Sequence, residues 1–155
     1  DKYLKLNGND AVATATNRFN NTHPTASVFS LGTSSALNDS GATQIAYLFA
    51  TAPGVSKVGS YTGNGNSDGP TIDCGFTSGA KFVVIKRTAS AGSWTILDTA
   101  RGIVAGNDPY IHFNSNGGNQ TSLDIIDPDS SGFKVSTSQD FINANGETFI
   151  FYAIA

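Results

Sequence analysis

An internal duplication is the feature that most constrains how this chain folds. Residues 27–50 and 132–155 align without a gap, at an offset of 105 residues between Ser27 and Gly132. Both segments contain Asn-x-x-Gly-x-Thr, which is typical of a turn, followed by an alternating run that ends in Tyr-x-x-Ala. The shared positions include Asn38/Asn143, Gly41/Gly146, Thr43/Thr148, Ile45/Ile150, Tyr47/Tyr152 and Ala50/Ala155.

A second match extends the duplication toward the start of the chain. Residues 3–7 resemble residues 110–114, at an offset of 107 residues. We therefore interpret residues 1–50 as the C-terminal half of one repeat unit and residues 51–155 as a complete unit, packed together as one β domain. Two equivalent strands, each ending in the shared tyrosine motif, are expected to lie pseudo-symmetrically.

The residue types indicate which secondary structure these units use. Charged residues make up 14% of the chain, against a usual value of about 25%, and the polar remainder is mostly Ser, Thr, Asn and 17 glycines. Thr, Val, Ile, Phe and Tyr favour strands, while Gly, Asn, Asp and Ser favour turns. Short strands with frequent turns predict an all-β fold, an antiparallel β-sandwich or jelly roll.

Two segments give the clearest strand signals. Residues 81–87 contain a continuous apolar run, which predicts a central strand buried on both faces. A polar loop at 88–92 predicts a hairpin back into residues 93–98, in which Trp94, Ile96 and Asp98 share one face. The other strands are expected at 2–7, 27–31, 43–50, 55–61, 71–76, 110–114, 123–126, 133–137 and 147–155, with single helical turns at 8–16 and 99–106.

The charge and the cysteine count exclude several classes of protein. A net charge of −3 does not suit a general nucleic-acid binder. The single cysteine, Cys74, forms no intramolecular disulfide and is interpreted as a small buried hydrophobe. No apolar stretch approaches the ~20 residues that cross a bilayer. We expect no cofactor and no membrane insertion, and because the chain begins with Asp1, we expect a processed product or part of something longer.

One loop resembles the start of a calcium-binding loop. Asn64, Asn66 and Asp68 place oxygen atoms at alternate positions, and Gly69 follows them. The twelfth position, where a bidentate Glu belongs, is Gly75. A glycine-rich turn explains the same residues, so the preferred interpretation is that the loop holds no metal.

Four aspartates raise the possibility of a glycosidase, because paired carboxylates carry out glycoside hydrolysis. They are Asp124, Asp127, Asp129 and Asp140. The stretch from Asp127 to Gly132 is better explained as a turn, in which proline fixes φ and aspartate caps the backbone. No nucleophile elbow, zinc-binding helix or phosphate loop is present. The chain is therefore not expected to be an enzyme.

Candidate ligand-binding residues are three aromatic side chains and one ion pair. Trp94, Tyr61 and Tyr110 offer flat rings of the kind that stack on a sugar, although core packing is the preferred interpretation for Trp94. Asp98 and Arg101 face each other across a turn and form a candidate sugar or anion site. An internal salt bridge that fixes the loop is the stronger interpretation of that pair.

The complete unit resembles a repeat found in marine bacteriophage proteins, which include tail fibres and uncharacterised phage structural proteins. The first half of the chain resembles the ending of the same repeat, including residues 25–32 and 46–50. The sequence departs from the usual pattern at Thr77-Ser78-Gly79, where a proline commonly follows Gly-Phe. The residues that carry the resemblance in the complete unit are those at 59–65, 68–70, 75–76, 83–88, 93–101 and 131–152.

This resemblance implies a protein of the virion surface, extracellular and multimeric, and it brings no catalytic residues. The leading hypothesis is a tail-fibre module that recognises a host cell-surface glycan or protein without covalent chemistry. The alternative is a purely structural subunit of a shaft, capsid decoration or filament that associates with copies of itself, as a trimer or a filament. A glycan hydrolase is the third and weakest hypothesis.

Overall fold

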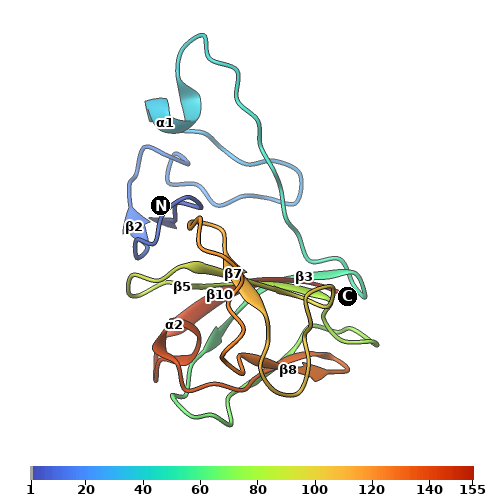
Figure 1. Ribbon diagram of the computed structural model, residues 1–155. Helices are drawn as coiled ribbons and strands as arrows, with labels where there is room; N and C mark the ends of the chain where they lie inside the picture. Colours follow the sequence, from blue (N-terminus) through green and yellow to red (C-terminus); the bar gives the residue numbers. More distant parts are fainter. Residues whose placement is uncertain (1) are drawn as a thin grey trace. The chain divides into compact units, whose positions relative to one another are not determined.

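The computed structural model describes residues 2–155, which fall into two compact units. One unit holds residues 12–48 together with the start of the chain up to residue 4. The other holds residues 5–11 and 49–155. Figure 1 traces the elements of both units along the chain.

The first unit has little regular structure. Strands β1 (Lys2–Tyr3) and β2 (Ala13–Thr14) form a two-residue antiparallel pair, and helix α1 (Ser35–Asn38) is a single turn. The guanidinium of Arg18 lies 3.8 Å above the ring of Tyr3, a cation–π contact. Most of this unit is exposed to solvent, including residues 43–48.

The second unit contains a five-stranded antiparallel sheet in the order β3-β10-β5-β6-β7. Its strands are β3 (Ser56–Thr62), β5 (Phe82–Arg87), β6 (Trp94–Asp98), β7 (Tyr110–His112) and β10 (Thr148–Ile154). The last strand of the chain therefore lies between the first and the second strands of this sheet. As predicted, β5 and β6 form a hairpin, with Lys86 opposite Trp94.

A second antiparallel sheet has three strands in the order β4-β9-β8. They are β4 (Thr71–Asp73), β8 (Ile126–Asp129) and β9 (Gly132–Val135), and helix α2 (Asp140–Asn143) lies between β9 and β10 in the chain. The all-β prediction is therefore confirmed at the level of antiparallel sheets, with only two short helices among residues 2–155.

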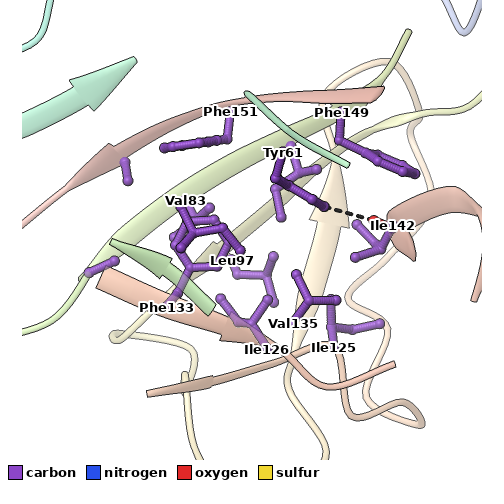
Figure 2. Packing of buried hydrophobic residues seen from close by; sticks show 14 of the residues in the cluster. Tyr61, Val83, Leu97, Ile125, Ile126, Phe133, Val135, Ile142, Phe149 and Phe151 are labelled. Atoms are coloured by element: carbon purple, nitrogen blue, oxygen red, sulfur yellow. Dashed lines mark hydrogen bonds between the residues drawn. The ribbon is translucent and has the colours of Figure 1, made fainter. Parts of the chain in front are cut away.

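Side chains of both sheets meet in one hydrophobic core (Figure 2). Tyr61 stacks on Phe149, with ring centroids 5.1 Å apart, and its hydroxyl donates to the carbonyl of Ile142 at 2.7 Å. Burial raises the pKa of Tyr61 far above its usual value, so the hydroxyl stays protonated. The fully buried members include Val83, Ile85, Leu97, Ile125, Ile126, Phe133, Val135, Ile142, Phe149 and Ala153.

Gly59 lets the ring of Phe151 on the neighbouring strand lie directly against the backbone of β3 within this core. A Cβ atom at this position would lie 2.7 Å from the ring of Phe151, which is closer than side chains pack. Phe151 is directly opposite Gly59 in the β3–β10 register, so its ring covers the glycine. The glycine therefore makes room for an aromatic core residue on the neighbouring strand.

Several expectations about local structure were wrong. Residues 27–31 and 43–50 form no strand, and β8 begins at Ile126 instead of ending there. The segment 8–16 contains β2 in place of a helical turn, and 99–106 contains no helix. Cys74 is a buried free thiol, as expected, and burial raises its pKa to about 11.

Candidate binding groove

An apolar groove of about 380 Å³ lies on the outer face of the five-stranded sheet, opposite the core. The residues that line it come from strands β3, β5, β6 and β10 and from three separate segments outside the strands. They are Leu6, Phe49, Val58, Gly59, Phe82, Val84, Trp94, Phe113, Ile150, Phe151 and Tyr152. The set contains no charged residue.

The groove exists because two adjacent strands are apolar on both faces. In β10, Phe149, Phe151 and Ala153 point into the core, so the alternating residues Ile150 and Tyr152 point outward. In β5, Val83 and Ile85 point inward, while Phe82 and Val84 point outward. Register places Tyr152 directly opposite Val84 on one side and Val58 on the other. A continuous apolar strip therefore crosses three strands.

Residues 5–11 cover one end of the strip. The indole Nε1 of Trp94 donates to the carbonyl of Lys5 at 2.9 Å, and the amide of Gly92 donates to the carbonyl of Asn9 at 2.8 Å. These two bonds hold the segment across the β5–β6 hairpin and bring Leu6 to the groove. Leu6 remains 54% exposed there.

Two further aromatic side chains form the groove's margins. Phe113 follows β7 directly, and its amide donates to the carbonyl of Trp94 at 3.0 Å. Phe49 packs on Tyr152, with ring centroids 5.0 Å apart. Phe113 is 52% and Phe49 is 64% exposed. Exposed aromatic side chains around an apolar floor are typical of a surface that binds another molecule.

A buried lysine lies on the same outer face. Lys86 is opposite Ile150 and Trp94, and its side chain is fully covered. Its ammonium donates to the carbonyl of Arg87 at 2.7 Å. Burial lowers the pKa of Lys86 below its usual value, although the carboxylate of Asp10 opposes that effect. Lys86 carries a positive charge beneath the surface but contributes none to the groove.

The structure separates the aromatic residues that the sequence had grouped as ligand candidates. Trp94 lines the groove, half-buried. Tyr61 and Tyr110 lie in the core, 9% and 6% exposed, and Tyr110 packs edge-on against His112. The rings of both tyrosines are covered by other side chains and are not placed to stack on a sugar.

Asp98 and Arg101 form an ion pair within one turn. The carboxylate of Asp98 also accepts the backbone amide of Arg101 at 2.8 Å, and its carbonyl accepts the amide of Gly102 at 2.9 Å. These contacts fix the loop after β6. Neither side chain lines the groove, so the pair adds no polar group to it.

In the calcium-like loop, the side-chain oxygens of Asn64 and Asp68 are bound by protein groups. Asn64 Oδ1 accepts from the amide of Asn66 and from the side chain of Asn143, at 3.0 and 2.9 Å. Asp68 pairs with Lys134 at 2.6 Å, which lowers the pKa of the Asp68 carboxyl. Among residues 2–155, no three His, Cys, Asp or Glu side chains are grouped as metal ligands.

The four aspartates considered for glycoside hydrolysis lie in different elements: Asp127 and Asp129 are in β8 and accept hydrogen bonds from serines, Asp140 begins α2, and Asp124 precedes β8. Asp127 accepts from the hydroxyl of Ser136 at 2.5 Å. Asp129 accepts from the amide and the hydroxyl of Ser131, at 2.9 and 2.7 Å, and these bonds lower the pKa of its carboxyl. Asp129 therefore caps the β8–β9 turn, but the predicted turn is shorter than expected, because Asp127 and Pro128 lie in strand β8.

Sequence reasoning missed most of the groove. Leu6, Phe49 and Phe113 lie in loops far apart in the chain, and no local pattern joins them. One signal was available: residues 82–85 and 149–154 lack polar alternation, so both faces of β5 and β10 are apolar and the face opposite the core requires a cover.

Neither of the short helices in residues 2–155 has the length and apolar character of a membrane span. The model of a family described as a domain of unknown function, DUF7483, matches residues 1–155. No curated protein and no solved structure matches the chain.

Proposed function

Because the chain belongs to the DUF7483 family, whose description assigns no activity, we propose its function from its own surface. The chain is a non-enzymatic β module of an extracellular virion appendage, and it attaches to protein through the apolar groove. The groove is what carries this proposal: eleven lining residues without one charge form a surface suited to apolar protein side chains.

The lining favours protein over sugar as the bound molecule. A sugar site combines an aromatic platform with several polar groups that bind the hydroxyls and fix orientation. Here Asp98 and Arg101 are used within their own turn, and Trp94 donates its indole N–H to Lys5. A structural role in self-association is therefore the first candidate, with copies of the chain as partners in a homo-oligomer.

Recognition of a host cell-surface glycan or protein is the second candidate. The observation that favours it is the ring of Trp94, which borders an open groove beside Phe113. The resemblance to phage tail fibres supports a position on the virion surface for both candidates.

We also propose a β-sandwich architecture for residues 49–155, because the five-stranded and three-stranded sheets share one core. The internal repeat is supported by matching hydrogen bonds at the 105-residue offset. The side chain of Asn38 donates to the carbonyl of Gly32, and that of Asn143 donates to the carbonyl of Thr137. The turns of α1 and α2 close with the same pair of backbone bonds, onto Ser34 and Gln139.

Light scattering over a range of concentrations tests the assembly proposal. We expect the wild-type chain to self-associate and the double variant Leu6→Ser, Phe113→Ser to remain monomeric, because both side chains are exposed at the groove. Val104→Ser is the matched control: Val104 is 47% exposed but lies outside the groove. A wild-type chain that stays monomeric at every concentration contradicts the proposal.

Fluorescence distinguishes the second candidate. Trp94 is the chain's single tryptophan and lines the groove. A glycan that binds there changes the emission of the wild-type chain at low protein concentration, whereas self-association changes the emission only as the protein concentration rises.

A further inference from the structure

One edge of the five-stranded sheet is open. Strand β3 pairs with β10 along one side only, and no other strand of residues 2–155 pairs with it. The amide of Val58 donates to the hydroxyl of Thr51 at 3.2 Å, on the side away from β10. By the two-residue period of a strand, the backbone groups of Ser60 and Thr62 point to that same side, and they have no strand partner there.

This edge differs from the other sheet edges of the unit. Strand β7 has three residues, and Tyr110 exchanges two backbone hydrogen bonds with Gln120. Strand β4 also has three residues, and β8 contains Pro128, which has no N–H to donate. Strand β3 has seven residues and no proline; Ser56 is bridged to Ala52 and Val58 bonds Thr51, so the open part of its edge is at Ser60 and Thr62. A long, exposed edge of this kind is a template for pairing with another strand.

The chain also contains a segment whose residue pattern is that of a strand but which pairs with no sheet. Residues 43–48 align with the start of β10, which pairs along both of its edges, yet they form no strand. Ile45, Tyr47 and Leu48 are 78%, 80% and 76% exposed. The segment carries no charge, and neither does the groove beside β3.

We propose that residues 43–48 of one copy add as an antiparallel strand to the free β3 edge of a second copy. Tyr47 then lies opposite Ser60 and Ile45 opposite Thr62. Residues directly opposite each other point to the same face of a sheet, so both apolar side chains extend the floor of the groove. The segment most similar to β10 thus pairs with the strand that already pairs with β10 on its other edge. This inference rests on the proposed role in self-association and names its contact.

The partner is a second copy because residues 49–51 of the same copy already hold the start of the edge. Thr51 bonds the amide and the carbonyl of Val58, at 3.2 and 3.4 Å, and Phe49 packs on Tyr152. A strand that continued along β3 within one chain would have to break both contacts. A strand from another copy can pair with Ser60 and Thr62 while those contacts remain.

Two variants separate the two halves of this contact. Ser60→Pro removes the outward N–H of the acceptor edge without removing a bond to β10, and Ser60→Ala is its control because it keeps the N–H. Tyr47→Asp places a charge in the donor segment, at a side chain that is 80% exposed in the single chain. We expect Ser60→Pro and Tyr47→Asp each to weaken association by about tenfold or more, and Ser60→Ala to have no effect.

Mixing the two defective variants is the decisive measurement, followed by sedimentation. The Ser60→Pro copy keeps an intact donor segment and the Tyr47→Asp copy keeps an intact edge, so an equimolar mixture should recover a one-to-one pair that neither forms alone. Association of Ser60→Pro at wild-type strength, or a mixture that stays monomeric, overturns the inference. If these variants associate normally while the Leu6/Phe113 double variant does not, this inference fails and the proposed function stands. If the wild-type chain never associates, both fail.

Discussion

The side chain of Asn143 holds Asn64 through two reciprocal hydrogen bonds. Its Oδ1 accepts the backbone amide of Asn64 at 2.8 Å, and its Nδ2 donates to Asn64 Oδ1 at 2.9 Å. Nδ2 also lies 2.7 Å from the carbonyl of Thr137. Asn143 is fully buried and joins α2 to the loop after β3. The asparagine-rich loop is therefore one half of a structural contact between distant segments.

Replacing Asn143 with alanine tests this contact. Asn143→Ala leaves the buried carbonyl of Thr137 and the part-buried amide of Asn64 without their partner, and an unsatisfied buried group costs roughly 1–3 kcal/mol. We expect the free energy of unfolding in urea to fall by about 2–4 kcal/mol. Asn145→Ala is the control, because Asn145 is exposed in the same turn. Equal stability of the two variants would contradict the role given to Asn143.

Asp108 has a similar role at another site. Its carboxylate accepts the amides of Val104, Ile125 and Ile126, at 3.1, 2.9 and 2.9 Å. Burial raises the pKa of the Asp108 carboxyl above its usual value, while these three hydrogen bonds oppose the rise. Asp108→Ala leaves the buried N–H groups of Ile125 and Ile126 and the part-buried N–H of Val104 unpaired, and we expect a loss of roughly 3–5 kcal/mol in urea unfolding.

Asp108→Asn provides the graded comparison. Asparagine keeps one oxygen that can accept two amides and faces the third with an NH2 group. The free energy of unfolding should therefore fall less in Asp108→Asn than in Asp108→Ala. A variant Asp108→Ala as stable as wild type would mean that water satisfies the three amides.

The pair Arg87 and Glu147 predicts an acid-dependent loss of stability. The guanidinium donates to both carboxylate oxygens, at 2.5 and 2.6 Å, and it lowers the pKa of Glu147 below 4.5. A lowered folded-state pKa means that the unfolded chain takes up the proton first as pH falls. The stabilisation is therefore complete above pH 4.5 and is lost as pH falls from there through the folded-state pKa.

Urea unfolding between neutral pH and pH 3 measures this effect. We expect the wild-type stability to fall more steeply below pH 4.5 than that of Glu147→Gln, which has no carboxyl to titrate. Arg87→Gln should flatten the same part of the curve, because it removes the cause of the pKa shift. Parallel curves for all three proteins would show that the pair does not contribute.

The elements that sequence predicted well are those whose pattern is local. Residues 82–85 are continuously apolar because β5 lies in the middle of its sheet with both faces covered, and the turn signal at 88–92 is enough to specify the hairpin to β6. The apolar run at the end of the chain likewise predicted β10 in the core. In these cases the local residue pattern alone identifies the strand, and pairing with neighbouring strands agrees with it.

The predictions that were wrong concern features that depend on contacts between residues distant in sequence. Residues 43–50 have the same strand pattern as β10, yet they form no strand, since a strand requires a partner edge that the pattern does not supply. The groove joins Leu6 to Phe113 through bonds of Trp94 to Lys5 and Phe113. Tyr61 was chosen as a possible platform because it is aromatic, and only the packing of Phe149 upon it reveals that it is a core residue.

Lys86 gives a prediction of opposite sign, a substitution that stabilises. Its ammonium is fully buried with one hydrogen bond, to the carbonyl of Arg87, and burial lowers its pKa. Methionine has a similar unbranched shape and no charge to desolvate. We expect Lys86→Met to raise the free energy of unfolding at neutral pH by about 1 kcal/mol.

The stability that Lys86→Met gains over the wild type should depend on pH, because the pKa of Lys86 is lowered in the folded protein. Because the folded-state pKa of Lys86 is lowered, the wild-type protein recovers stability as pH rises through that value toward 10.5, where the unfolded chain also loses its proton. The advantage of Lys86→Met should therefore shrink as pH approaches 10.5. Lys81→Met is the control, since Lys81 directly precedes β5 and is exposed, so its replacement should give no gain in stability. A less stable Lys86→Met protein would show that the nearby carboxylate of Asp10 more than offsets the burial of the ammonium.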